Sequence, residues 1–295
     1  MKAYKYRKID AFTTYKSLGN PAACIYLERE QSLSDVEMLD IAKQHKGFVS
    51  EMVYCSPKSQ FSFSLVYYSS ECEVDFCGHG TIACMYDLIK ENPDLLNQRE
   101  IEIYTNKKGS LIVYNEIQTQ DSVYITAPLP KYIGTNICVE IIAENLQMNS
   151  RQISNAYPID IIDAGLKTLI VPITTLKDEI NIFPNEPVLK QFCFKNNIDI
   201  ILIYSLEVEN KQNKAHTRVF APKFGYLEDP ATGSGNSAFG YYMLKNNLWD
   251  GSAISIEQGG IDRLFNTVKL LFKDNLVLFG GKATTRIKGD YYLGV

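Results

Sequence analysis

The hydrophobic pattern of the first quarter of the chain predicts strands around one well-marked helix. Ser34, followed three residues later by Glu37, is a capping-box pair that marks a helix start, and Gly47 marks the end of that helix. The segments on either side are rich in aromatic and β-branched residues, the composition of strands. The predicted strands are Tyr4 to Phe12, Ala22 to Leu27, Phe48 to Tyr54 and Phe61 to Tyr68.

Several segments recur later in the chain at a nearly constant offset. Cys77-Gly-His-Gly-Thr, followed by an apolar run, corresponds to Thr232-Gly-Ser-Gly-Asn, followed by another (232 − 77 = 155). Ile101-Glu-Ile-Tyr-Thr parallels Ile254-Ser-Ile-Glu-Gln (254 − 101 = 153). Val123-Tyr-Ile-Thr parallels Val277-Leu-Phe-Gly (277 − 123 = 154). Similar offsets in three elements indicate an internal duplication.

Each copy therefore predicts several strands, a glycine-rich turn, one long helix and further strands. The two helices span Cys77 to Lys90 and Thr232 to Lys245. Apolar and small residues wrap most of the way round both, which is typical of a helix enclosed by sheet rather than of an amphipathic surface helix.

The boundary between the copies is expected near Ala127-Pro-Leu-Pro130, because two prolines interrupt the strand pattern there. A polar helix is predicted next, near Val139 to Gln147. We therefore predict two similar α+β domains, residues 1–128 and 129–295. A return of the last strand to the first domain is left open.

The composition is that of an ordinary soluble globular protein. Of 295 residues, 45% are hydrophobic and 22% charged, and the formal charge of −4 is spread without a basic stripe. This argues against nucleic acid and anionic membrane surfaces as partners. The polar start of the chain precedes no apolar run, and no segment approaches the roughly 18 apolar residues of a membrane span. We expect a cytoplasmic protein.

The seven cysteines are odd in number and irregularly spaced, in a chain large enough to need no disulfide bridges. With three histidines and no Cys-x-x-Cys or His-x-x-x-His pair, the sequence shows no spacing typical of a zinc site. We predict reduced thiols, no metal and no cofactor.

The glycine-rich helix starts of both copies are candidates for a binding site. Free amides and partial positive charge at a helix N-terminus attract anions, and glycine lets a carboxylate approach the backbone. Either turn alone has a simpler interpretation, a connection that needs glycine dihedrals and binds nothing. Two copies favour a site for a small carboxylate that both helix starts face. The predicted binding residues are Gly78, Gly80, Thr81, Thr232, Gly233, Ser234 and Gly235.

His79 and Asp229 accompany these two turns. The helix dipole disfavours an imidazolium at the position of His79, so we expect a neutral imidazole there. Asp229 lies three residues before Thr232. Capping is the commoner role of an aspartate in this position, and contact with a substrate is the alternative.

Glu51 is a candidate general base. The period of a strand puts it on the same face as Val49 and Val53. If that face is apolar and gives the carboxyl no partner, burial raises its pKa, which suits proton removal from carbon near neutral pH. The sequence equally allows this face to be the solvent side.

These features together resemble the PhzF-like (phenazine biosynthesis) family, within the diaminopimelate epimerase-like fold. Any one motif is weak, but the ordered set spans most of the chain. It comprises Asp10-Ala-Phe-Thr, Gly19-Asn-Pro-Ala-Ala, Ser50-Glu51, Glu73-Val-Asp-Phe-Cys-Gly-His-Gly-Thr-Ile-Ala, Gly165-Leu, Arg218 to Pro222, Glu228 to Ser234 and Gln258-Gly259.

The resemblance implies two pseudosymmetric domains, each a curled mixed sheet or barrel around a central helix, assembled as a homodimer. It also implies a cofactor-independent isomerase in which Glu51 moves a proton on a small carboxylate-bearing metabolite, with His79 and Asp229 assisting. Two alternatives stay open: a non-catalytic binder of small carboxylates, and a cysteine-dependent enzyme that uses Cys77. The two-cysteine chemistry of related amino-acid epimerases is disfavoured, because the second position is Thr232, whose hydroxyl has too high a pKa.

Overall fold

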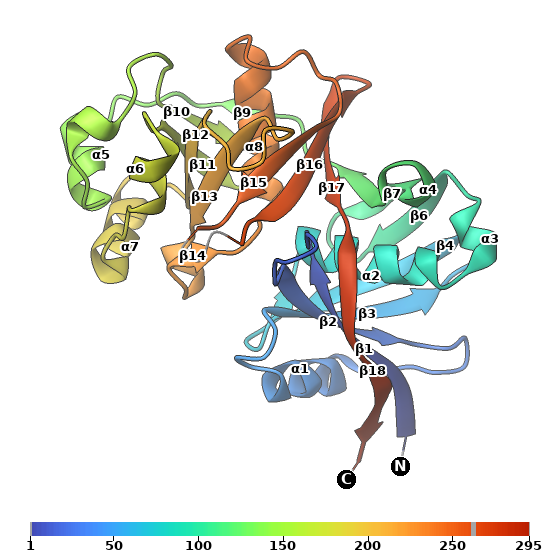
Figure 1. Cartoon of the computed structure of the whole chain (residues 1–295). Helices are drawn as coiled ribbons and strands as arrows, with labels where there is room; N and C mark the ends of the chain where they lie inside the picture. The colour runs from blue at the N-terminus through green and yellow to red at the C-terminus, as the bar shows by residue number, and fades with distance from the viewer. Residues whose placement is uncertain (1, 261–263, 295) are drawn as a thin grey trace. The chain divides into compact units, whose positions relative to one another are not determined.

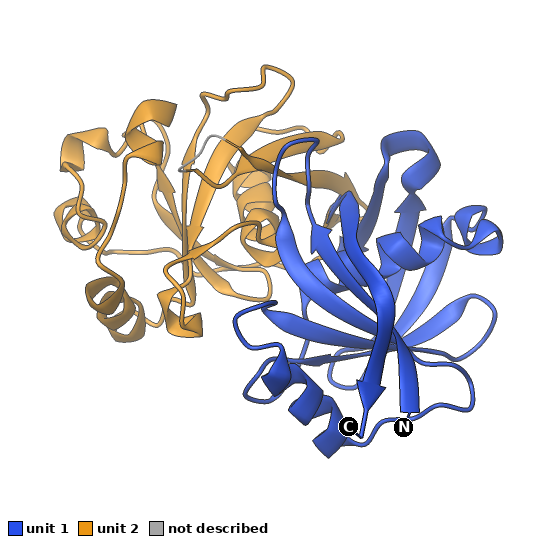
Figure 2. Cartoon of the chain, turned by 60° about the horizontal axis from the view of Figure 1, so that its bottom comes forward, with its two compact units in different colours: residues 1–126, 280–295 blue, residues 127–279 orange. Residues whose placement is uncertain are grey.

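The chain passes twice between two structural units, which Figure 2 distinguishes by colour. The computed structural model describes residues 2–260 and 264–294. Unit 1 comprises residues 1–126 and 280–295, and unit 2 comprises residues 127–279. Unit 2 is therefore inserted between the body of unit 1 and its last strand.

Unit 1 is a curled mixed sheet around one long helix (Figure 1). Its elements are β1 Lys2–Ala11, β2 Asn20–Tyr26, α1 Asp35–Gln44, β3 Glu51–Pro57, β4 Ser62–Tyr68, β5 Glu73–Val74, α2 Gly78–Lys90, α3 Pro93–Leu96, β6 Glu100–Thr105, β7 Gly109–Glu116, α4 Ile117–Gln120, β8 Ser122–Thr126 and β18 Ala283–Leu293. The strands pair in the order β18–β1–β2–β3–β4–β6–β7–β8, with β5 beside the end of β4. The curled sheet is not a closed barrel.

Unit 2 repeats this arrangement. Its elements are β9 Lys131–Tyr132, α5 Val139–Asn145, the short 3-10 helix η1 Ser150–Gln152, β10 Asp160–Asp163, β11 Lys167–Pro172, α6 Leu176–Ile180, α7 Glu186–Lys195, β12 Ile200–Ser205, β13 Ala215–Phe220, η2 Pro222–Phe224, β14 Glu228–Asp229, α8 Gly233–Lys245, β15 Ile254–Gln258, β16 Asn266–Lys273 and β17 Leu276–Gly281. Its strands pair in the order β9–β10–β11–β12–β13–β15–β16, with β14 beside β13.

The pattern of parallel and antiparallel pairs is the same in both units. The β2–β3 and β4–β6 pairs of unit 1 are parallel, as are the matching β11–β12 and β13–β15 pairs of unit 2. Glu51 begins β3 opposite Ala22, and Ile200 begins β12 opposite Thr168. Glu51 and Ile200 are therefore counterparts. The duplicated fold predicted from the sequence is confirmed.

The long helices α2 and α8 are largely buried, as their apolar composition predicts. Nine of the thirteen residues of α2 and ten of the thirteen of α8 are buried, against three of ten in α1. Ile82, Met85 and Ile89 of α2 are fully enclosed, and each contributes roughly 1.5–3 kcal/mol through burial. This packing fixes the helix starts relative to the sheet of their own unit.

Shorter helices cover the outer face of each sheet. In unit 1, Met38 and Ile41 of α1 pack on Met52 and Tyr54 of β3, and the Tyr54 hydroxyl donates to the Met38 carbonyl at 2.6 Å. In unit 2, α5 and α7 form a corresponding apolar core with strands β10 to β13. Each sheet is thus buried on both faces over part of its area.

Most predicted elements appear close to their expected bounds. Ser34 and Glu37 form the predicted capping box at the start of α1. The strand expected from Phe48 begins only at Glu51, because the amides of Phe48 and Val49 donate to the carbonyl of His45 and continue the turn after α1. The domain limits at residues 128 and 129 stay predictions.

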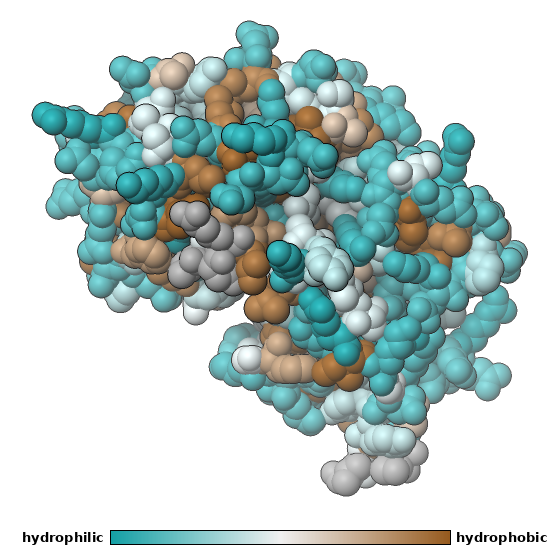
Figure 3. All heavy atoms as spheres, viewed as in Figure 1, coloured by the Kyte–Doolittle hydropathy of each residue, from teal (hydrophilic) through white to brown (hydrophobic). Residues whose placement is uncertain are grey.

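The surface in view in Figure 3 is mainly hydrophilic, with smaller apolar patches. Every helix in the described part of the chain is too short or too polar to cross a membrane. All seven cysteines are unpaired, and five of them are buried.

Candidate active site

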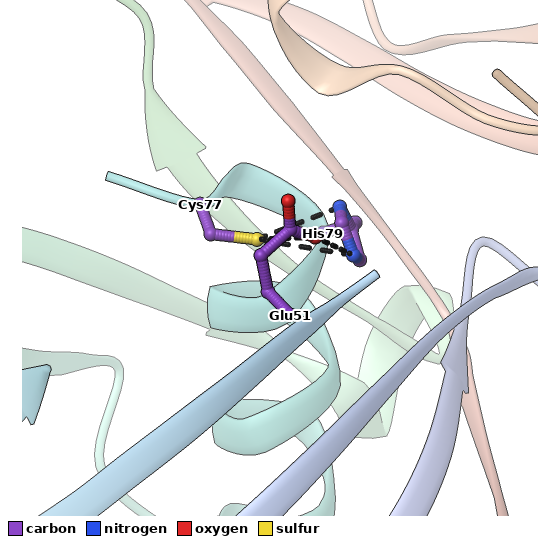
Figure 4. Close-up of side chains that lie close together, drawn as sticks. All are labelled: Glu51, Cys77 and His79. Atoms are coloured by element: carbon purple, nitrogen blue, oxygen red, sulfur yellow. Dashed lines mark hydrogen bonds and ion pairs between the residues drawn. The ribbon is translucent and has the colours of Figure 1, made fainter. Parts of the chain in front are cut away.

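Three side chains of unit 1 meet where β3 begins and α2 starts (Figure 4). Oε2 of Glu51 lies 3.2 Å from Nε2 of His79 and 3.8 Å from Sγ of Cys77. The Cys77 sulfur is 3.5 Å from Nδ1 of His79 and 3.8 Å from Nε2. The predicted residues Glu51 and His79 are therefore direct neighbours, and Cys77 contacts both.

The local backbone explains this meeting. Cys77 is the N-cap of α2, where its sulfur accepts a hydrogen bond from the amide of Gly80 at 3.3 Å. A side chain at position 80 would place its Cβ 2.9 Å from Sγ of Cys77 and 2.9 Å from Cγ2 of Val53. Gly80 therefore lets the helix start approach β3, and this approach brings His79 and Glu51 together.

The structure shows what lies against the face of β3 that carries Glu51. Met52 and Tyr54 lie against α1, whereas Val53 lies against the start of α2. The Glu51 side chain is 20% exposed. It points to the α2 side and is neither fully solvated nor buried without a partner, because His79 pairs with it.

The expected neutral imidazole of His79 is wrong. Burial alone lowers the pKa of His79, but the neighbouring Cys77 sulfur and the Glu51 carboxylate outweigh it and hold that pKa well above its ordinary value. A carboxylate oxygen at 3.2 Å acts more strongly than the partial charge of a helix end. The direction of this shift favours the imidazolium form of His79 beside the Glu51 carboxylate.

Cys77 is less suited to nucleophilic chemistry than its position suggests. Burial raises the pKa of its thiol, and the nearby Glu51 carboxylate adds to the rise, while His79 opposes it. Only the thiolate is a strong nucleophile. The ligand-free cluster therefore favours a protonated thiol that donates to Glu51.

Thr81, predicted as a binding residue, has an internal role. It is fully buried, and its hydroxyl donates to the Cys77 carbonyl at 2.7 Å and lies 2.8 Å from the Tyr67 hydroxyl. Gly78 and His79 are partly exposed at the helix start. These two residues, rather than Thr81, offer surface to a ligand.

At the start of α8 in unit 2, uncharged side chains form a hydrogen-bond network around the carboxylate of Asp229. The hydroxyl of Thr232 donates to the buried carboxylate of Asp229. Gln258 accepts from the amide of Thr232 at 2.9 Å and from the side chain of Asn236 at 2.7 Å, and it donates to the carbonyl of Asp229 at 2.9 Å. The Asp229 carboxylate thus holds the hydroxyl of the N-cap residue Thr232, and its predicted role as a cap or as a substrate contact stays a prediction.

The first turn of α8 itself has no side-chain cap in the described structure. Thr232 occupies the N-cap position but directs its hydroxyl to Asp229. Ser234 is partly exposed, while Gly233 and Gly235 are buried. An added Cβ at Gly233 would lie 2.2 Å from the Phe279 ring, so this glycine permits close packing within unit 2. The prediction that both helix starts face one active site stays a prediction.

Sequence reasoning missed two groups in unit 2. The role of Gln258 follows from its place at the end of β15, which becomes visible only once the strands are aligned. His216 is fully buried 3.1 Å from the equally buried Glu179. Arg218 is also buried and donates to the carbonyls of residues 179, 180 and 182. The signal available in the sequence was the pair of ionisable residues, His216 and Arg218, within the six residues of β13.

The chain matches the phenazine biosynthesis-like protein family over residues 9–289. Among curated proteins it is similar to an uncharacterized isomerase of Clostridium acetobutylicum, with 25% identity over 84% of this chain and 82% of that protein. The uncharacterized isomerase YfhB of Bacillus subtilis is 26% identical over 88% of this chain and 87% of that protein.

Solved structures share the fold. A PhzF-family phenazine biosynthesis protein from Bacillus anthracis superposes with a TM-score of 0.85 and 23% identity, covering 99% of this chain and 100% of that one. A hydroxyproline epimerase from Agrobacterium vitis, solved with trans-4-hydroxy-L-proline bound, has a TM-score of 0.57 and 8% identity, with 99% and 91% coverage. The two-unit curled-sheet fold predicted from the sequence is confirmed.

Proposed function

Because the chain belongs to the phenazine biosynthesis-like protein family, we propose that it is an isomerase that shifts a proton on a small carboxylate-bearing metabolite without a cofactor. The names of the curated relatives support isomerisation as the reaction class. The observation that carries the proposal is the contact between the Glu51 carboxylate and His79 at the start of α2.

In this proposal Glu51 removes a proton from a carbon next to a carboxylate and returns it at another position. The contacts of Glu51 with His79 and Cys77 hold its carboxylate in one position, and a positioned carboxylate can act as a general base. His79, as the imidazolium partner, stabilises the charged form of Glu51 and donates a hydrogen bond to charge that develops on the substrate.

We propose that the start of α8 contributes binding of anionic groups. Its first-turn amides, at Gly233, Ser234 and Gly235, carry the partial positive charge of the helix and have no side-chain cap among the described residues. Asp229 supports this turn through Thr232.

The test is exchange of carbon-bound hydrogen with solvent deuterium. Chelator-treated protein in D2O is incubated with a panel of small 2-amino and 2-hydroxy carboxylates, including trans-4-hydroxy-L-proline, and carbon-bound deuterium is followed by NMR. For any compound that wild type exchanges, Glu51→Gln should reduce the rate by about 100-fold to 10,000-fold, the usual contribution of a general acid or base. Full activity of that variant excludes the proposal.

Two further measurements separate the alternatives. Under the proposal, Cys77→Ser retains most of the exchange, because the serine hydroxyl still donates to Glu51; a cysteine-dependent enzyme loses all of it. A compound that binds in calorimetry but is never deuterated by wild type indicates a binding protein instead. The homodimer and the cytoplasmic location stay predictions, and sedimentation equilibrium tests the first.

A further inference from the structure

The cluster at the start of α2 contains three different metal-binding side chains. A carboxylate oxygen of Glu51, the sulfur of Cys77 and a ring nitrogen of His79 all lie within 4.8 Å of one another. Figure 4 shows the three groups directed at one another from β3 and α2. The sequence gives no sign of this because Glu51 comes from a strand that precedes Cys77 by 26 residues.

The separations match those of a tetrahedral zinc site. Zinc bonds of about 2.0–2.3 Å to nitrogen, oxygen and sulfur place neighbouring ligands about 3.3 Å apart for N and O, and about 3.5 Å apart when one is S. The observed separations are 3.2 Å from His79 to Glu51, 3.8 Å from Cys77 to Glu51 and 3.8 Å from Cys77 to Nε2 of His79. Because Sγ of Cys77 also lies 3.5 Å from Nδ1 of His79, the imidazole has to turn before a nitrogen lone pair faces the ion.

The donor set selects among metals. Sulfur and imidazole nitrogen favour Zn²⁺ over Mg²⁺ and Ca²⁺, which prefer oxygen ligands. On binding, Zn²⁺ displaces the thiol proton of Cys77 and the imidazolium proton of His79 to the solvent. The two negative ligands then balance the charge of the ion. Three protein ligands leave one coordination position for water or for a carboxylate.

We infer that Glu51, Cys77 and His79 form an inhibitory Zn²⁺ site, in which the bound ion withholds the Glu51 carboxylate from proton transfer. The binding of the ion stands on the geometry of the cluster alone. Only its inhibitory effect rests on the proposed function, since the same oxygen cannot both bind zinc and accept a proton from carbon.

The test uses Co²⁺ as a spectroscopic substitute for Zn²⁺. The exposed cysteines, Cys72 and Cys138, are first replaced by serine so that they do not bind metal. Titration of the chelator-treated protein should then end at one equivalent, with a sulfur-to-cobalt charge-transfer band and the intense visible bands of a four-coordinate ion. One equivalent of Zn²⁺ should remove these bands.

Variants assign the ligands. Cys77→Ser should lose the charge-transfer band, and Glu51→Gln and His79→Gln should each bind Zn²⁺ at least about 10-fold more weakly, since even residues that only orient metal ligands matter this much. Glu73→Gln, which changes a partly buried carboxylate of β5 in the same unit, is the matched control and should bind as wild type. Circular dichroism verifies that each variant is folded.

Absence of a stoichiometric end point, or a charge-transfer band that survives Cys77→Ser, overturns the zinc site. Unchanged affinity in Glu51→Gln removes Glu51 from the site and overturns the inhibitory mechanism. For a compound that wild type deuterates, one equivalent of Zn²⁺ should stop the exchange, and EDTA should restore it. The isomerase proposal is tested separately, by deuterium exchange in metal-free protein, where full activity of Glu51→Gln excludes it.

Discussion

The starts of α2 and α8 occupy equivalent places in the two units, yet they carry different chemistry. The register of the strands and the offset of the helices pair three residues of unit 1 with three of unit 2. These pairs are Glu51 with Ile200, Cys77 with Thr232 and His79 with Ser234. Unit 1 thus places ionisable groups where unit 2 has apolar or neutral ones.

This difference shows how one duplicated backbone holds an ionisable residue in one copy and an apolar residue in the other. The Glu51 carboxylate is tolerated at a partly buried position because His79 pairs with it and 20% of its side chain stays exposed. Ile200, its counterpart, is only 1% exposed and packs near Gly235 and Thr232. The backbone is shared, and the side chains alone decide which unit can hold a charge.

The largest expected effect on stability comes from placing a carboxylate at position 200 of unit 2, the counterpart of Glu51. Ile200→Glu should lower the free energy of unfolding by at least about 3 kcal/mol at pH 7, because each pKa unit by which burial raises an unpaired carboxyl costs about 1.36 kcal/mol. Urea unfolding measures this loss. The loss should shrink as the pH falls towards about 4.5, the ordinary pKa of a glutamate, because protonation of the carboxyl in the folded chain then costs less and less relative to the unfolded chain.

Ile200→Gln is the matched control. It also buries a polar group, so its loss of stability should be independent of pH over the same range. Unfolding of Ile200→Glu at the same urea concentration as wild type at pH 7 would show that unit 2 accepts a charge here, and the contrast between the units would not hold.

A smaller effect is expected at the buried carboxyl of Glu179, which lies beside His216 in unit 2. Burial raises the pKa of Glu179 above its ordinary value of 4.5, although His216 and Arg218 oppose the rise and Glu228 adds to it. The folded chain therefore retains this proton to a higher pH than the unfolded chain. The stability gained from it is complete below about pH 4.5 and is lost as the pH rises through the folded pKa.

Glu179→Gln should remove this contribution. The difference in unfolding free energy, wild type minus variant, should fall with rising pH at up to about 1.4 kcal/mol per pH unit above pH 4.5. Urea unfolding at a series of pH values from about 4.5 to 7.5 measures it. A difference that stays constant, or that rises with pH, contradicts a raised pKa for Glu179.

The smallest effect compares the same substitution at the two helix starts. An added Cβ meets Sγ of Cys77 and Cγ2 of Val53 at 2.9 Å in Gly80→Ala, but its nearest contact in Gly235→Ala is at 3.3 Å. Alanine gains about 1 kcal/mol in helix propensity at both positions. Gly235→Ala should therefore be near neutral, and Gly80→Ala less stable than it by about 1 kcal/mol through overpacking. Urea midpoints measure the difference, and equal midpoints contradict it.

The scaffold was predictable from the sequence because local signals and the repeat agree. Ser34 and Glu37 specify a helix start through two short-range hydrogen bonds. Apolar and small residues lie on most sides of the α2 and α8 segments, which indicates helices enclosed by sheet. The nearly constant sequence offset between the repeated segments indicates duplicated halves. None of these inferences needs knowledge of contacts between distant residues.

The chemistry of the site was less predictable because it depends on contacts across the fold. His79 was expected to be neutral from its place at a helix end, and the neighbouring Cys77 and Glu51 side chains, which raise its pKa, reverse that expectation. The face of β3 that carries Glu51 could not be chosen, since α1 and α2 bury opposite faces of the same strand. The buried pair of Glu179 and His216 likewise joins α6 to β13.

The pairing of β1 with β18 has a consequence for synthesis on the ribosome. The two strands pair from Lys2 opposite Leu293 to Ala11 opposite Ala283, with one register shift between Lys8 and Ile9. β1 emerges early, whereas its partner is translated only after all of unit 2. Until then β1 has an open edge, which is a template for aggregation. A chain that ends before β18 therefore contains all of unit 2 but leaves the edge of β1 unpaired in unit 1, the unit that carries Glu51.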